Sequence, residues 1–287
     1  MSHFIRPFQT IISFYFGLIL ANSVQADQTT ARQAMENPSN PLFSMVTSQG
    51  EIFIELFSRE TPNNVANFTA LAEGKIELFD ESTNTAFKPR YYDGMRFHRV
   101  IPGFIIQAGS PSYSPLGGPE ELLQDEINAD FLGLDETLVL NPDGSFHEIL
   151  GINEKIDFDS AILRPLYIKM SIETQADLVA RQYEVLDRLS AMTLKEVYEN
   201  LGYRYINDMP SHRVSRGTIA LTNSGPDQNG PEFFISLVDA DYLTGMHTVI
   251  GQVVEGMDIA DSIGNYPVDP LRFTRLSTVI YTVRRVE

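Results

Sequence analysis

The chain has 287 residues, of which 43% are hydrophobic and 21% are charged, as in an ordinary globular protein of one or two domains. Its net charge is −17, which argues against nucleic acid and anionic membrane surfaces as partners, because phosphate contacts need clustered basic side chains. The chain contains no cysteine, which excludes disulfides, a thiol nucleophile and thiolate metal ligands.

The N-terminus, residues 1–26, has the pattern of a secretory signal peptide. Arg6 supplies a positive charge, residues 11–20 form an apolar run, and residues 24–26 (VQA) are a small-residue cleavage site. An apolar run of this length is too short to cross a bilayer, which needs roughly 20 residues. We therefore expect a periplasmic or secreted protein with no stable membrane insertion after cleavage. An uncleaved anchor is the alternative for the N-terminus, and secretion through an endoplasmic reticulum is the alternative for the compartment.

A polar spacer is expected over residues 27–40, and two strands joined by a Gly-containing turn follow in LFSMVTSQGEIFIELF. The next stretch predicts a helix with both ends marked. Thr61 is its expected N-cap, Pro62 its first helical residue and Gly74 the residue just past its end.

The stretch YYDGMRFHRVIPGFIIQAG predicts a strand, a Pro-Gly turn and a second strand. Further short strands are expected in RGTIALTNSG, EFFISLVDA, HTVIGQVVEGM and STVIYTVRRV, and a second short helix in EGMDIADSIGN. Short strands at regular spacing favour a β-barrel or a β-sandwich.

Residues 127–211 differ in character and are interpreted as an insertion. LVLNPDGSFHEIL predicts a hairpin, and SIETQADLVARQYEVLDRLSAM and TLKEVYENLG predict two amphipathic helices. A Thr193/Glu196 capping box marks the start of the second helix. The stretch NPDGSFHE does not form a calcium loop, because Leu150 stands where the loop needs a glutamate.

An arginine, Arg99, lies within the otherwise almost wholly apolar stretch FHRVIPGFIIQAG. A guanidinium carries five hydrogen-bond donors and is rarely buried without a partner. Two alternatives follow: an acidic side chain elsewhere in the fold satisfies Arg99, or Arg99 lines a groove and binds a ligand.

The stretches YYDGMRFHRVIPGFIIQAGSP and GTIALTNSGPDQNGPEFFISLVDADYLTGMHTVIGQVVEGMDI resemble the cyclophilins, which are peptidyl-prolyl cis-trans isomerases. The resemblance covers residues 41–287 and is interrupted by residues 127–211. It implies a mainly β fold: a closed eight-stranded antiparallel barrel capped by two helices, with an inserted mainly helical segment. Together with the signal peptide, it suggests an exported bacterial member of the family.

The resemblance also implies the roles of individual residues. Arg99 matches the catalytic arginine, which bonds the prolyl nitrogen as the peptide bond twists. Gln107 would hold the substrate carbonyl, Phe104 the proline ring, and Asn223 the peptide backbone through its own main chain. The remaining residues expected to bind substrate are Ile101, Ile105, Thr222, Ser224, Glu232, Phe234, Tyr242, Leu243 and His247. This mechanism needs no metal and no cofactor.

Several residues depart from the commonest pattern of the family. Glu232 replaces a glutamine, and it is expected to pair with Arg99. Tyr242 replaces a tryptophan, and Thr222 and Ser224 replace small apolar residues. His98 alternates to the face opposite Arg99 and is expected to be structural.

Two functions remain open at this point. The first is a monomeric isomerase that acts on proline-containing peptides and unfolded exported proteins. The second is a non-catalytic scaffold of the same fold that holds unfolded chains or a fixed partner. In either case the insertion is expected to extend the client surface beside the groove, although apolar helix faces more often simply pack as decoration.

Overall fold

The computed structural model describes residues 26–80, 83–114, 117–266, 268 and 277–287. Apart from Ala26, the expected signal peptide lies outside these residues. Across the described ranges, no helix combines the length and the apolar character needed to cross a membrane.

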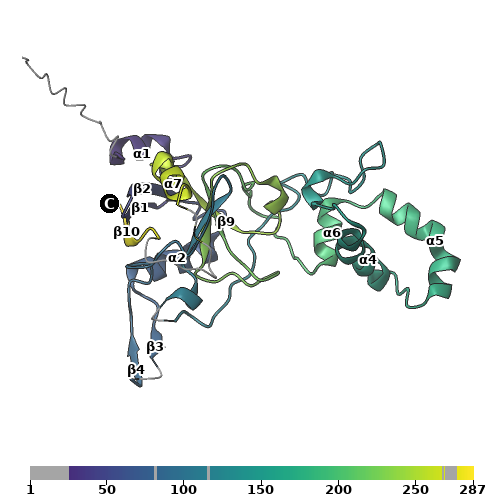
Figure 1. Cartoon of the computed structure of the whole chain (residues 1–287), viewed down its shortest axis with the longest axis horizontal. Coiled ribbons are helices and arrows are strands. Elements are labelled where there is room, and N and C mark those ends of the chain that lie inside the picture. The colour runs from purple at the N-terminus through teal and green to yellow at the C-terminus, as the bar shows by residue number, and fades with distance from the viewer. Residues whose placement is uncertain (1–25, 81–82, 115–116, 267, 269–276) are drawn as a thin grey trace, which may run out of the picture.

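The frame of the molecule is an antiparallel sheet of eight strands in the order β10-β1-β2-β9-β7-β8-β6-β5 (Figure 1). These strands are β1 Leu42–Thr47, β2 Gly50–Leu56, β5 Arg99–Ile101, β6 Ile105–Ala108, β7 Thr218–Leu221, β8 Phe233–Ser236, β9 Val249–Glu255 and β10 Ile280–Arg285. A separate hairpin of β3 Leu78–Asp80 and β4 Thr85–Phe87 projects from the body of the molecule.

The sheet curls so that its two end strands approach each other. The segment before β5 meets the start of β10 through an isolated bridge between Arg96 and Val279. The Phe97 N–H also donates a hydrogen bond to the Thr278 carbonyl at 3.0 Å. The fold is therefore mainly β, as expected, but it is an open, curled sheet whose ends meet over a short contact and not the closed barrel that was expected.

Two helices cover the main core, which the inner faces of the strands form. Helix α2 spans Pro62–Glu73 and helix α7 spans Met257–Gly264. Pro62 opens α2 as predicted, and Gly74 ends it with a φ of 71°, a left-handed conformation that favours glycine. The core contains Phe43, Ile52, Ile54, Phe68, Tyr92, Phe97, Ile106, Phe233, Ile235 and Ile250, among others.

The predicted polar spacer is instead partly helical. Helix α1 spans Gln28–Ala34 and is capped by the side chain of Asp27, which accepts a hydrogen bond from the Thr30 N–H at 3.1 Å. Ala31 and Met35 are buried in a small cluster with Leu42 and Phe53. The prediction failed because few apolar residues mark this helix, so its sequence carries little periodicity.

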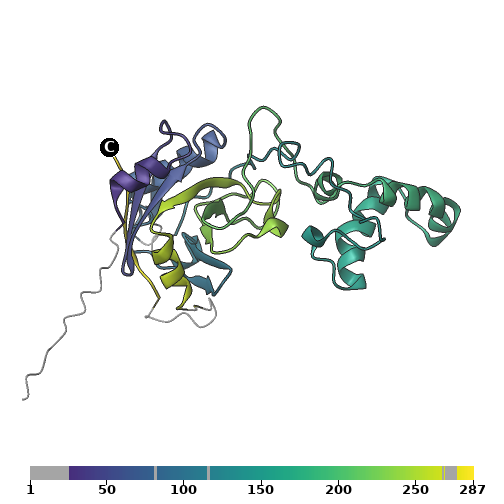
Figure 2. The same ribbon diagram turned by 90° about the horizontal axis from the view of Figure 1, so that it is seen from above.

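Residues 127–211 have a hydrophobic core of their own, separate from the core under the sheet. Their helices are α3 Lys155–Phe158, α4 Arg164–Lys169, α5 Gln175–Ser190 and α6 Leu194–Asn200, with a π-helical turn, Asp159–Leu163, between α3 and α4. The predicted hairpin is short. Leu140 and Phe146 form a bridge, and the His147 and Asn141 N–H groups donate to the Val139 and Ser145 carbonyls at 2.8 Å. Figures 1 and 2 show α4, α5 and α6 at the opposite end of the molecule from α1 and β1.

The two ends of this segment lie side by side. The Ile206 N–H donates to the Ile127 carbonyl at 2.9 Å, and the Asn128 N–H donates to the Ser211 hydroxyl at 2.8 Å. The segment thus leaves the sheet and returns to it at nearly the same point.

Candidate active site

Side-chain alternation in β5, β6 and β8 separates the candidate site from the main core. Arg99 lies opposite Gln107 in the β5–β6 register, and Gln107 lies opposite Phe234 in the β6–β8 register. Their neighbours Val100 and Ile106 belong to the main core. Because successive side chains of a strand point to opposite faces, Arg99, Gln107 and Phe234 share the outer face of the sheet.

The predicted apolar residues gather on this face as a distinct group. Ile105 and Phe234 are buried there, and Ile101, Phe104 and Leu243 pack against them partly exposed. We call these five residues the outer cluster. They pack against buried side chains from neighbouring segments. These side chains are Phe57, Val214, Ala220, Ala240 and Val249.

Two aromatic rings flank the outer cluster. His247 meets Phe234 edge-on with ring centroids 5.4 Å apart, and its Nδ1 lies 3.0 Å from the Leu221 carbonyl. Burial lowers the pKa of His247, so the ring is neutral at pH 7, and its expected role as a wall of the substrate pocket stays a prediction. Tyr242 stacks on Phe104 at 5.8 Å and is 44% exposed.

The Arg99 guanidinium is half-buried and donates from Nη1 to the Gln107 Oε1 at 3.0 Å. Among the described residues, no carboxylate lies within ion-pair distance of it. The expected pair between Arg99 and Glu232 is therefore wrong. Of the two alternatives for this arginine, an acidic partner is not found among the described residues, and ligand binding in a groove stays a prediction.

Glu232 instead accepts a hydrogen bond from the Gln107 amide nitrogen, and the His98 Nε2 lies 3.1 Å from the same carboxylate oxygen. His98 is buried and stacks on Tyr113 with ring centroids 4.6 Å apart, which fits a structural role. Burial works to raise the pKa of Glu232, but hydrogen bonds from His98, Gln107 and Ser110 hold it below its ordinary value. The carboxylate is thus ionised at neutral pH and linked to Arg99 through Gln107.

Of the predicted residues 222–224, which follow β7, one forms a hydrogen bond to the main chain of Glu232. The Thr222 N–H donates to the Glu232 carbonyl at 2.9 Å, and the Asn223 side chain donates to the Met246 carbonyl at 2.8 Å. Ser224 is exposed. Asn223 therefore joins its own loop to residues 242–246, and its expected main-chain contact with substrate stays a prediction.

The 127–211 segment was expected to lie beside the groove, but the residues that make the contact were not predicted. The Tyr205 hydroxyl donates to the Gly245 carbonyl at 3.0 Å. A Cβ on Gly245, which has a φ of 87°, would lie 2.5 Å from a Leu134 methyl carbon and 3.2 Å from the Tyr198 ring. The segment therefore packs closely against the loop that carries Tyr242 and Leu243. The partners are separated by many residues along the chain, so no local pattern could have revealed the contact.

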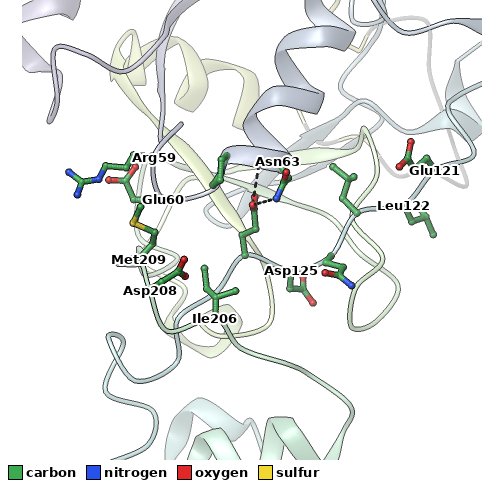
Figure 3. A pocket seen from close by; sticks show the side chains of 13 residues that line it. Arg59, Glu60, Asn63, Glu121, Leu122, Asp125, Ile206, Asp208 and Met209 are labelled. Atoms are coloured by element: carbon green, nitrogen blue, oxygen red, sulfur yellow. Dashed lines mark hydrogen bonds between the residues drawn. The ribbon is translucent and has the colours of Figure 1, made fainter.

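A second hollow, of about 480 Å³, lies beside the start of α2 and is lined by none of the predicted site residues (Figure 3). Carboxylates dominate its lining, but two of them are engaged. Glu126 accepts hydrogen bonds from the Asn63 and Asn64 main chains at 3.0 and 2.9 Å, and Asp125 accepts one from the Asp227 N–H at 2.8 Å. The hydrogen bonds to Glu126 connect the start of α2 to a distant part of the chain, and the hollow is separate from the candidate site.

Comparison with known proteins identifies relatives of the chain. The family model described as "Cyclophilin type peptidyl-prolyl cis-trans isomerase/CLD" matches residues 42–285. Peptidyl-prolyl cis-trans isomerase B of Streptomyces anulatus is 26% identical over 83% of this chain and 91% of its own length. Probable peptidyl-prolyl cis-trans isomerase A of Mycobacterium leprae is 24% identical over 80% of this chain and 84% of its own length.

A crystal structure of a cyclophilin type peptidyl-prolyl cis-trans isomerase from Cryptosporidium parvum is also similar. It is 18% identical, covers 86% of this chain and 98% of its own, and gives a TM-score of 0.48.

Proposed function

The chain belongs to the cyclophilin-type peptidyl-prolyl cis-trans isomerases, and from this premise we propose that it accelerates rotation about X-Pro bonds with Arg99 as the catalytic group. One observation carries the proposal. Arg99 lies on the same face as the outer cluster, and within the described chain its hydrogen-bond partner is an amide oxygen and not a carboxylate. No described carboxylate therefore neutralises its charge in an ion pair.

The reaction explains why such a group is useful. A peptide bond resists rotation by about 18–20 kcal/mol, because the nitrogen lone pair is delocalised into the carbonyl. Twisting an X-Pro bond localises that lone pair on the prolyl nitrogen, which becomes a hydrogen-bond acceptor only near the transition state. A guanidinium placed there stabilises the twisted bond more than either planar isomer, which is the requirement for catalysis.

The other residues position the substrate. The proline ring packs on the outer cluster, which offers apolar surface and a neutral His247 wall. Gln107 holds its amide oxygen toward Arg99 because Glu232 takes the amide nitrogen. In this arrangement Gln107 orients the guanidinium, and its remaining amide hydrogen is left for the substrate carbonyl.

The proposal is tested by measuring isomerisation of a short Ala-Pro peptide by exchange NMR, with the full chain and an Arg99→Ala variant. We expect the variant to lose about 100-fold in kcat/KM, the size of effect seen when one transition-state donor is removed. Arg99→Lys should recover only part of this loss, because a lysine keeps the charge but lacks the planar fork.

The matched control is Arg285→Ala, which removes an exposed arginine from β10. It should leave kcat/KM unchanged. If the parent chain binds the peptide but does not accelerate exchange, the isomerase proposal fails and the non-catalytic scaffold takes its place. If Arg99→Ala matches the parent, Arg99 is not the catalytic group.

The client class is part of the proposal. The expected signal peptide leads us to propose that the chain is exported and acts on unfolded proteins in the same compartment. N-terminal sequencing of the mature protein tests this: a start at Asp27 supports it, and a start at Met1 in the cytoplasmic fraction contradicts it.

A further inference from the structure

A cavity of about 290 Å³ lies between the loop that follows β8 and the 127–211 segment. We call it the side cavity. The loop contributes Tyr242, Leu243 and Met246 to its lining. The residues lining it from the 127–211 segment are Ile149, Leu150, Gly151, Ala161, Val197, Tyr198 and Leu201.

The lining of the side cavity is apolar or aromatic, with no charged side chain. A neighbouring hollow of about 430 Å³ on the other side of Tyr242 differs, because Glu148, Arg213, Asp239 and Asp241 line it. Leu201 and Tyr242 are 40% and 44% exposed, so large apolar side chains of the side cavity are open to solvent. An open hollow of this chemistry gains free energy by taking up another apolar group.

The side cavity is continuous with the outer cluster. Leu243 belongs to both, because it packs against the buried residues of the outer cluster and also lines the cavity. Tyr242 stacks on Phe104 on one side and lines the cavity on the other. A peptide whose proline lies on the outer cluster therefore passes the cavity within a few residues.

The size of the cavity limits what it can hold. Pockets for whole ligands occupy about 300–1,000 Å³, so a cavity of about 290 Å³ suits one large side chain. In an extended peptide, side chains two residues apart point to the same side, and each residue advances the chain by about 3.3 Å. A peptide whose proline lies on the outer cluster would therefore direct the side chain two residues away toward the same side as the proline ring.

We propose that the side cavity is a specificity site of this isomerase, built by the 127–211 segment, which binds a large apolar side chain two residues from the proline. The proposal rests on the function proposed above. It gives the segment a direct role in substrate choice, since seven of the ten lining residues come from it.

The test uses the full chain and a set of Ala-Pro peptides that are identical except for one leucine. The leucine is placed in turn at each position from three residues before the proline to three residues after it. Exchange NMR gives kcat/KM, and chemical-shift titration in the same samples gives affinity. We expect leucine two residues from the proline, on one side only, to raise kcat/KM by about 5- to 20-fold over alanine.

Two variants connect this preference to the cavity. Leu201→Asp places a charge in the lining and should bring the leucine/alanine ratio to about one, whereas Leu201→Met should keep the preference. Leu186→Asp is the matched control, because Leu186 is 55% exposed on α5 and does not line the cavity. It should leave the ratio unchanged.

The outcomes separate the two proposals. If the alanine peptide is accelerated but no leucine position gives an advantage, the side-cavity proposal is wrong and the isomerase proposal stands. If no peptide is accelerated, the isomerase proposal fails, and equal affinities for leucine and alanine peptides would overturn the side-cavity proposal as well. A preference that disappears as protein concentration rises would show that a second copy of the chain fills the cavity, which also overturns it.

Discussion

A carboxylate accepts hydrogen bonds and cannot donate them, so Glu232 fixes the orientation of the Gln107 amide beside Arg99. A glutamine at this position could donate or accept, and the Gln107 amide would then be free to turn over. The negative charge is held in place by His98, whose ring is buried behind it. Glu232, one of the residues that depart from the family pattern, therefore orders the polar half of the site.

The lowered pKa of Glu232 predicts how stability depends on pH. Its contribution to the free energy of unfolding is present above the unfolded pKa of glutamate, about 4.3, and is lost as the pH falls through the lower pKa of the folded state. We expect the stability difference between the parent chain and Glu232→Gln to be larger at about pH 6 than at about pH 3. Urea unfolding at several pH values measures it. A difference that stays constant with pH would contradict the prediction.

Sequence reasoning was strongest at this scale for residues on regular strands. Alternation and flanking motif were enough to place Arg99, Gln107 and Phe234 on one face. The prediction of the partner of Glu232 failed. Strand pairing and side-chain geometry decide whether Arg99 or Gln107 donates to this carboxylate, and in the structure Gln107 does. No pattern in the sequence contains that information.

Helix α2 shows how an element can depend on a distant residue. Thr61 occupies the N-cap position as predicted, but its hydroxyl donates to the Phe57 carbonyl and does not cap the helix. Glu126 caps it instead, with hydrogen bonds from the main chains and side-chain amides of Asn63 and Asn64. A carboxylate is well suited to this end of a helix, where the N–H groups carry partial positive charge.

Removing this carboxylate should destabilise the protein substantially. Glu126→Ala leaves buried N–H donors unpaired, and we expect a loss of about 2–4 kcal/mol in the free energy of unfolding. Urea unfolding at neutral pH is the measurement. Glu121→Ala is the control, because Glu121 is exposed in the same hollow and should change stability by at most about 0.5 kcal/mol. Equal effects of the two substitutions would show that Glu126 does not hold α2.

Among the helices, those with amphipathic periodicity and marked ends were predicted correctly. Helix α6 begins after Thr193 with the predicted capping box to Glu196, and α7 was found where expected. Helices α3 and α4 were missed because Pro165 interrupts their sequence. In the structure Pro165 lies in the first turn of α4, where a proline is tolerated because the helix needs no N–H there.

At the scale of the whole molecule, the sheet and the 127–211 segment have separate hydrophobic cores. The sequence indicated a separate segment at residues 127–211, and the structure gives these residues their own core. The chain order suggested a place beside the groove but not the contacts that hold the segment there. These contacts, such as Tyr205 with Gly245 and Leu132 with Arg213, join residues with no common periodicity.

This arrangement predicts that the segment can be removed. Because the Asn128 main chain bonds Ser211, a short Gly-Ser link should replace residues 129–210 without stretching the sheet. We expect the shortened chain to fold and to keep Arg99-dependent acceleration of the short Ala-Pro peptide. Circular dichroism and exchange NMR are the measurements. A shortened chain that does not fold would show that the two cores are one cooperative unit.

The pairing of β1 with β10 has a consequence for biosynthesis. β1 pairs with β2 on one side and β10 on the other, and β10 ends only two residues before the C-terminus. At ~5–20 residues per second, the ribosome needs roughly 10–50 s to proceed from the first of these strands to the last. Throughout that interval one edge of β1 is unpaired and can associate with strands of other chains. The 127–211 segment can complete its own core in the meantime, whereas one edge of β1 stays open to association until β10 has been made.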